Sequence, residues 1–289
     1  MGAPLNLKTA VEEGSNMPLK QQKKGDLVYF IDPDIPVPHA FSTRLGGVSA
    51  GMYESLNFGI NLGDNPEHVR ENYTGMLHAL DSNCESLVFG RQIHTDIVRL
   101  VGKKDALTDL FQTDLAEADA LVTSEKDLTL TVFTADCIPI LLWDAESGAV
   151  SAIHAGWRST VLDIAGKAVR ALVAHTNSAP EHIRAAIGPG IGPCCFETDK
   201  EVPQAVNTVL GNHAVHCIVE KEHEKAMVDL KEVNRRLLLL AGVLPERISV
   251  SEHCTMCHPE YFWSHRKMGK SRGSLASFIR MSDEKGRTT

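Results

Sequence analysis

The hydrophobic pattern predicts a β-hairpin near the middle of the chain. Residues 138–153 consist of an apolar run, a turn-like segment and a second β-type run. If the turn centres on residue 146, the numbers of facing residues sum to about 292, and Cys137 lies beside His154. Facing residues have Cβ atoms roughly 4.5–5.5 Å apart. The open end of the hairpin therefore brings a thiol and an imidazole together.

The rest of the pattern alternates between strands and helices. Asn65, an N-cap followed by proline, predicts a helix that runs to about Leu80. Apolar residues at helical spacing predict another helix with Ser159 or Thr160 as its cap and Asp163 in its first turn. Further strands are predicted at 27–31, 39–43, 87–101, 128–135, 183–188, 214–220 and 247–250, and further helices at 200–210 and 229–241.

This order of elements predicts an α+β fold. Strands outnumber helices, and both hairpins and strand–helix–strand crossovers occur, which favours mixed β-sheets with a sandwich-like core flanked by helices. Neither a repeat nor a linker divides residues 27–289, so we expect a single domain. Residues 1–26 are polar and lack the apolar stretch of a secretory signal, and we expect them to form a flexible extension.

Composition narrows the functional class. The chain has 289 residues, of which 43% are hydrophobic, enough for a substantial core. Its net charge of −8 and the absence of a dense Lys/Arg block argue against a nucleic-acid surface. No stretch of eighteen apolar residues occurs, so we expect no membrane span. The 7 cysteines, without a signal peptide, are expected to be thiols or metal ligands in a reducing cytoplasm.

A third residue joins the hairpin pair as a candidate ligand. His94 lies in the segment 87–101, which we interpret as a strand interrupted at Gly90. Together with Cys137 and His154 it makes a His₂Cys set, and catalytic zinc typically takes three protein ligands. Two other interpretations stay open at this stage. The three are ordinary buried residues, or Cys137 is a nucleophile activated by His154, with Asp136 orienting the imidazole.

Two other groups of residues have weaker signals. Arg158 could bind a phosphate beside a helix N-terminus, although a surface arginine next to a core Trp157 is the simpler interpretation. The glycines of GPGIGPCCFE lack nucleotide-motif spacing and favour a rigid loop that allows close backbone approach.

The C-terminal segment EHCTMCHPEYFWSHRK contains one CxxC motif, formed by Cys254 and Cys257. A structural zinc would need two further ligands, such as Cys194 or Cys195. With a single CxxC, buried thiols are the preferred interpretation.

Seven motifs occur in a fixed order: HAFSTRLGGVSAGMYESLNFG, QIHTDIV, ADALVTS, TADCIPILLWD, IHAGWRST, IGPGIGPCCFE and YFWSHRKMGKSRG. Across residues 27–281 the chain thereby resembles the laccase-domain family, whose members are described as polyphenol oxidases and as purine nucleoside phosphorylases. One segment departs from the family pattern: SHRKMGKSRG, with Arg266 and Arg272, stands where members more often have a doubled arginine and a Thr-Gly-Arg turn.

The resemblance implies a metal centre and a reaction. The ligands would be His94, Cys137 and His154, and the metal zinc, with Cu²⁺ as the alternative. It implies phosphorolysis of adenosine, inosine, guanosine and S-methyl-5'-thioadenosine to base and sugar-1-phosphate, together with adenosine deamination. Purine nucleosides and phosphate would be the partners, without nucleic acid or membrane, and the protein would be a monomer or a weak homo-oligomer.

From these expectations follows a mechanistic hypothesis. Zinc would activate a water molecule for attack on the purine C6, and Asp136 would move protons. For phosphorolysis, Arg44 would hold phosphate through its guanidinium fork, Asn57 would bind a ribose hydroxyl, and Trp157 would stack on the base. The competing functions are a Cys–His amidase or peptidase acting on peptidoglycan precursors, a copper-dependent polyphenol oxidase, and a non-catalytic binding protein.

Overall fold

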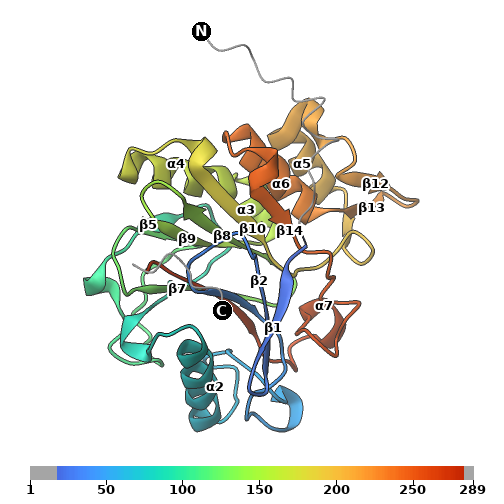
Figure 1. Ribbon diagram of the computed structural model, residues 1–289. Helices are drawn as coiled ribbons and strands as arrows, with labels where there is room; N and C mark the ends of the chain where they lie inside the picture. Colours follow the sequence, from blue (N-terminus) through green and yellow to red (C-terminus); the bar gives the residue numbers. More distant parts are fainter. Residues whose placement is uncertain (1–17, 283–289) are drawn as a thin grey trace.

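Two six-stranded β-sheets form the centre of the protein (Figure 1). The computed structural model describes residues 18–282. The first sheet has the order β1–β2–β3–β15–β7–β4, with bounds Lys20–Lys24, Leu27–Ile31, His39–Ser42, Leu275–Arg280, Thr129–Thr134 and Leu87–Val88. The second has the order β14–β10–β8–β9–β6–β5, with bounds Ile248–Val250, Ile183–Ile187, Ile138–Asp144, Val150–Ala155, Ala120–Thr123 and Val98–Leu100. A small third sheet has the order β11–β13–β12, with bounds Glu197–Asp199, Lys225–Val228 and Ile218–Glu220.

Helices cover the outer faces of the two large sheets (Figure 1). Helix α2, Pro66–Ala79, lies against the first sheet. The outer side of the second sheet carries α3 (Trp157–Val161), α4 (Ile164–Thr176), α5 (Glu201–Leu210) and α6 (Leu230–Leu240). Helix α7, His265–Met268, precedes β15. The 3₁₀ helices are Gly51–Tyr53, Cys84–Ser86, Lys103–Asp105, Pro180–His182, Gly211–Ala214 and Pro245–Arg247. None of the helices in the described residues is long and apolar enough to span a bilayer.

Side chains of the central strands alternate between apolar layers. On β8, Ile140 faces the helices while Leu141 faces the first sheet. On β15, Ile279 faces the second sheet while Phe278 faces α2. Strands that are covered on both faces need apolar residues at consecutive positions, which explains the continuous run in residues 138–143. The predicted α+β sandwich with flanking helices is therefore confirmed.

The first strand begins earlier in the chain than predicted. Strand β1, Lys20–Lys24, pairs antiparallel with β2, so it belongs to the first sheet and not to a flexible extension that ends at residue 26. Residues 1–17, the remainder of the expected extension, lie outside the described residues.

One predicted helix start is confirmed and the other is wrong. The Asn65 side chain accepts the backbone N–H of Glu67 and caps α2 as expected. After β9, however, the chain forms two helices, and Ser159 and Thr160 are buried inside the first, α3. Asp163 is the N-cap of α4, with φ 61°, because the chain turns sharply between these helices.

The strand predicted at 87–101 is also wrong as a single element. Its ends are β4 in the first sheet and β5 in the second, and the residues between them cross from one sheet to the other. His94 lies in this crossing segment with φ 59°, so it is not a mid-strand residue. A left-handed backbone conformation there breaks the extended conformation that the apolar pattern predicted.

We expect Arg184→Ala to destabilise the protein strongly. Arg184 on β10 is 8% exposed, and its Nε lies 3.1 Å from the carboxylate of the fully buried Asp32. Loss of the guanidinium leaves this carboxylate unpaired, which costs about 3–5 kcal/mol of unfolding free energy. Chemical denaturation measures the loss. Arg70→Ala, which breaks an exposed pair with Asp109, is the matched control and should cost less than about 1 kcal/mol. Equal losses for the two variants would contradict the prediction.

Candidate functional site

Three candidate ligands from separate parts of the fold meet at one point. His94 comes from the crossing segment, Cys137 from the end of the β7–β8 connection and His154 from β9. One ligand atom of each lies within 4.8 Å of the other two. The hairpin pairs Pro139 with His154, so facing numbers sum to 293 and the expected register is one residue off. The predicted closeness of the three side chains is found, and their role as metal ligands stays a prediction.

Asp119, immediately before β6, holds two of these residues in place. Its carboxylate accepts the Nδ1 side of the His154 ring at 2.8 Å and the backbone N–H of His94 at 3.0 Å. It also accepts the backbone N–H and the hydroxyl of Thr95, at 2.8 and 3.0 Å. Because Nδ1 of His154 is engaged, Nε2 is the nitrogen left to face a ligand.

The charges of the site favour an ionised thiol. Burial opposes the charged form of Cys137, but the charge of His154 and hydrogen bonds from His154 and His94 lower its pKa to about 6. Burial likewise opposes the charged form of His154, while Cys137 and Asp119 raise its pKa to about 9. The pKa of Asp119 falls to about 2, because hydrogen bonds and the charge of His154 outweigh its burial. Without a metal ion, these pKa values favour a thiolate beside an imidazolium at neutral pH.

Two glycines allow the backbone to approach the site closely. A Cβ on Gly156 would lie 2.6 Å from His94 Nδ1 and 3.2 Å from the sulfur of Cys137. A Cβ on Gly190 would lie 2.4 Å from the Ile138 side chain and 3.1 Å from the backbone oxygen of Asp136. The glycine-rich loop at 188–192 is thus a close-packing loop, as the sequence predicted.

A cavity of about 680 Å³ opens over the three candidate ligands. Its size suits a small organic molecule. Besides the ligands, its lining combines aromatic, cationic and amide side chains: Phe89, Phe133, Trp157, Phe196, Arg91, Arg266, Arg272, Gln92 and Asn61. A flat apolar ring and an anion could both be accommodated here.

Arg44 and Asn57, the two candidate substrate residues of the Gly-rich loop, do not line this cavity. The Arg44 guanidinium donates to the backbone oxygens of Glu54 and Pro259 and lies 3.7 Å from the centre of the Trp263 ring. Asn57 is fully buried, and its side-chain oxygen accepts the backbone N–H groups of Gly59 and Ser274. Both polar groups have partners within the Gly-rich loop and in residues 259–274, and the expected contacts with phosphate and ribose find no support.

The other candidates divide between the cavity and the surface. Trp157 and Asp136 line the cavity. The Asp136 carboxylate accepts the Thr255 hydroxyl at 2.6 Å and the backbone N–H of Arg266 at 2.7 Å, which fixes its orientation. Arg158 is exposed outside the cavity lining, with its guanidinium 4.3 Å from the Trp157 ring centre.

Two residues of this site were missed by the sequence reasoning. Asp119, and not Asp136, orients His154, although it stands within the ADALVTS motif. A charged residue between apolar strand positions is the signal that could have singled it out. Arg272 lies in the cavity lining; burial lowers its pKa, and the charges of Asp136 and Cys137 oppose that effect.

Fold and site together define an α+β sandwich protein with a His₂Cys group at the floor of a cavity. A family model described as multi-copper polyphenol oxidoreductase laccase matches residues 38–282. The chain belongs to this laccase-domain family.

Several proteins of known name are similar to the chain. It is 34% identical over 247 residues to purine nucleoside phosphorylase YlmD of Bacillus subtilis, covering 84% of this chain and 88% of that protein. It is 34% identical over 237 residues to adenosine deaminase RL5 of an unknown prokaryotic organism, covering 81% and 90%. The crystal structure of YlmD from Geobacillus stearothermophilus superposes with a TM-score of 0.85 at 32% identity, covering 92% of this chain and all of that one.

We expect Cys137 to be alkylated at unusually low pH in metal-free protein. The thiolate is the reactive form, so a lowered pKa shifts the half-maximal rate of iodoacetamide modification to about pH 6, against 9.0 for an ordinary thiol. His154→Ala removes the stabilising charge and leaves the burial, so the midpoint should rise. Mass spectrometry of the Cys137 peptide measures the rate. His175→Ala, at an exposed histidine of α4, should leave the midpoint unchanged, and a His154→Ala midpoint still near pH 6 would refute the pairing.

We expect Asp119→Asn to weaken metal binding about 10- to 100-fold, because the carboxylate orients His154 and fixes the loop of His94. Competition with a chelating dye measures the affinity. Asp96→Asn, which breaks an ion pair with Lys167 beside the same loop, is the matched control and should bind metal normally. Equal affinities for the two variants would show that Asp119 does not position the ligands.

Proposed function

We propose that this protein is a zinc-dependent purine nucleoside phosphorylase with adenosine deaminase activity. Its substrates would be adenosine, inosine, guanosine and S-methyl-5'-thioadenosine, with base and sugar-1-phosphate as products of phosphorolysis. One observation carries the proposal: a three-ligand His₂Cys group lies in the floor of a cavity whose walls are aromatic and cationic. The names of the relatives, purine nucleoside phosphorylase and adenosine deaminase, agree with it. We place the protein in the cytoplasm, because all seven of its cysteines are free thiols.

The donor set fits zinc. Imidazole nitrogens and a thiolate are both common zinc ligands, and catalytic sites keep three protein ligands with a fourth position open. His94, Cys137 and His154 supply three donors from one side, and the cavity lies on the other. Zinc bound there would supply a Lewis acid that polarises a substrate oxygen or a water molecule.

Arg272 takes the place of Arg44 as the proposed phosphate ligand. It lines the cavity and lies close enough to Cys137 for their charges to interact. Its guanidinium donates to the backbone oxygen of Gly273 at 2.7 Å and, through Nε, to His265 Nδ1 at 3.5 Å, which restrains the side chain. The remaining N–H groups can bind an oxyanion in two-point fashion. This arrangement would place phosphate next to the ligand group.

The aromatic residues would hold the purine, and Asp136 would serve proton transfer. Trp157 and Phe133 present flat apolar surfaces to the cavity, on which a base can stack. Asp136 lies beside Cys137 with each carboxylate oxygen engaged by one donor, and a carboxylate oxygen has a second lone pair for a substrate proton.

A second candidate function rests on the contact between Asp119 and His154. The series Asp119, His154 and Cys137 places an oriented imidazole next to a thiolate, the arrangement of a Cys–His amidase or peptidase. In that mechanism His94 has no task, whereas the zinc enzyme requires it. Loss of metal and of nucleoside turnover in His94→Ala supports the phosphorylase. Hydrolysis of a peptidoglycan-precursor amide that is retained in His94→Ala supports the amidase.

The copper oxidase suggested by the description of the family model has less support. In residues 18–282, the groups able to hold a metal are the His₂Cys group and one set of four cysteines. Multicopper oxidation needs several histidine-rich sites, so this donor inventory favours zinc chemistry.

Incubation with adenosine and with inosine, each with and without phosphate, tests the proposed reactions. We expect base and ribose-1-phosphate only when phosphate is present, and inosine from adenosine in both conditions. Removal of metal by a chelator should abolish both activities, and added Zn²⁺ should restore them. Chromatographic identification of the products is the measurement, and unchanged nucleosides in every arm would refute the proposal.

We expect Arg272→Gln to raise the KM for phosphate about 10- to 100-fold, because a charge-assisted hydrogen bond contributes about 1.5–3 kcal/mol. The KM for inosine at saturating phosphate should change less. Arg170→Gln, at an exposed arginine of α4 outside the cavity lining, is the control and should leave both constants unchanged. An unaltered phosphate KM in Arg272→Gln would assign the anion to another residue.

A further inference from the structure

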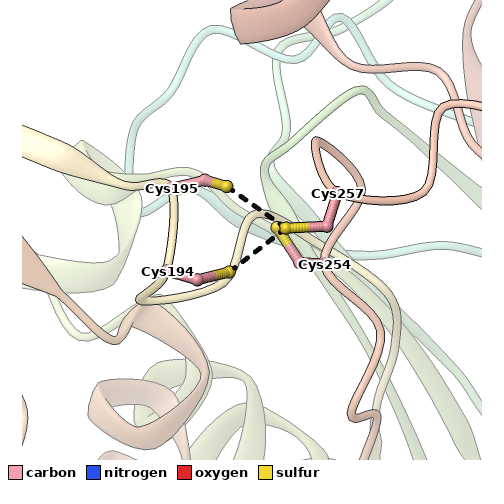
Figure 2. A group of neighbouring side chains, drawn as sticks. All are labelled: Cys194, Cys195, Cys254 and Cys257. Atoms are coloured by element: carbon pink, nitrogen blue, oxygen red, sulfur yellow. Dashed lines mark hydrogen bonds between the residues drawn. The ribbon is translucent and has the colours of Figure 1, made fainter.

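Four cysteines meet at a second position, separate from the His₂Cys group. Cys194 and Cys195 end the glycine-rich loop that follows β10, and Cys254 and Cys257 come from the loop that follows β14. In Figure 2 the four sulfur atoms point toward one another from these two loops. Cys194 and Cys257 are exposed, so the sequence-based preference for four buried thiols is wrong.

The spacing of the sulfur atoms matches a tetrahedral metal site. All four lie within 4.8 Å of one another, and Cys257 Sγ lies 3.5 Å from Cys194 Sγ and 3.4 Å from Cys195 Sγ. With Zn–S bonds of about 2.3 Å, the edge of a ZnS₄ tetrahedron is about 3.8 Å. A disulfide would need about 2.05 Å. The four thiols are free, and their separations are close to the tetrahedral edge.

Backbone donors around Cys254 stabilise negative charge on its sulfur, whereas burial raises the pKa values of Cys194 and Cys195. The backbone N–H groups of Gly192, Met256 and Cys257 are directed at Cys254, the first of them at 3.2 Å. Backbone donors of this kind stabilise thiolate ligands. A Cβ on Gly192 would lie 3.1 Å from Cys254 Cβ and 3.3 Å from Cys194 Sγ, so a side chain here would crowd both cysteines.

A buried lysine adds a positive charge to the same region. Lys231 on α6 is 5% exposed and donates to the backbone oxygens of Ser251 and His253, which lead into Cys254. Its charge acts on Cys254 and Cys194. Four thiolates around a divalent cation carry a net charge of minus two, which this ammonium partly offsets.

We propose that Cys194, Cys195, Cys254 and Cys257 bind a structural Zn²⁺ ion. Closed tetrahedral sets of four cysteines are typical of structural zinc, which has no open position for substrate. Each thiol gives up its proton to the solvent when the ion binds. The site is independent of the proposed nucleoside chemistry and of the His₂Cys group.

The ion would join two loops that shape the cavity. The first loop contributes Ile191 and Phe196 to the cavity lining, and the second leads into α7, which contributes His265 and Arg266. The same loops hold Asp136, through its backbone oxygen and the N–H of Ile191 and through its carboxylate and Thr255. A metal link between them would fix the connection that carries Cys137.

Metal content of variants tests the proposal. Protein purified with Zn²⁺ present and then desalted should contain about two zinc ions per chain by elemental analysis. Cys194→Ser/Cys257→Ser changes two exposed residues and should lose one ion, and His94→Ala should lose the other. Cys84→Ser is the matched control, because Cys84 is a free thiol outside both groups, and it should keep two.

The outcomes separate the two sites. A single zinc in the wild type that is lost in His94→Ala and kept in the double cysteine variant overturns the proposal. A disulfide among the four cysteines in protein purified under reducing conditions, or iron in their place, also overturns it. A single zinc that is lost in the double cysteine variant and kept in His94→Ala supports this site and refutes the metal of the proposed phosphorylase.

A measurement on the unmodified chain covers the case in which the double variant fails to fold. Co²⁺ takes the place of Zn²⁺, and each thiolate ligand adds sulfur-to-cobalt charge-transfer absorption. In fully loaded wild-type protein, the charge-transfer absorption should have the intensity of about five thiolate ligands, four from this site and one from Cys137. In His94→Ala it should have the intensity of about four. A band of one-thiolate intensity in the wild type overturns the proposal.

Discussion

The carboxylate of Asp119 is the constraint on which the candidate site depends. This residue immediately precedes β6, which pairs with β9, and it binds the His154 ring together with the backbone that carries His94. One buried group thus sets the orientation of one candidate ligand and the path of the chain at another. Its charge is retained because an imidazole and several N–H groups outweigh the cost of burial. The positions of two candidate ligands therefore depend on the side chain of Asp119.

The crossing segment between β4 and β5, which carries His94, is hydrogen-bonded both to the first sheet and to Asp119. On one side, the Gln92 side chain exchanges hydrogen bonds with the backbone of Phe133 on β7 in the first sheet. On the other, Thr95 donates to Asp119, which immediately precedes β6 of the second sheet. His94 lies between these anchors. Its position thus depends on the relative placement of the two sheets, whereas Cys137 and His154 are placed by a single hairpin.

This difference explains what could be predicted from the sequence. Apolar alternation and a local turn determine the hairpin. The sequence therefore predicted that Cys137 and His154 lie close together, with an error of one residue in the strand register. The conformation of His94 depends on Asp119, 25 positions away, which no local pattern encodes. The position of Arg44 outside the cavity lining was hidden for the same reason, because its partner Pro259 is 215 positions away. Contacts between residues far apart in the sequence determine the conformation of His94 and the hydrogen-bond partners of Arg44, and a local sequence pattern does not reveal such contacts.

Strand β1 has a consequence for how the molecules behave in a crowded solution. It is the edge of the first sheet, and its sequence KQQKK places lysines where another chain would have to pair. Edge strands with unpaired backbone groups invite sheet-to-sheet association, and lysine side chains oppose it through charge and hydration. Behind it lies β2, LVYFI, which is apolar throughout. The cationic strand β1 therefore lies between the apolar strand β2 and neighbouring molecules, and it protects the first sheet from aggregation.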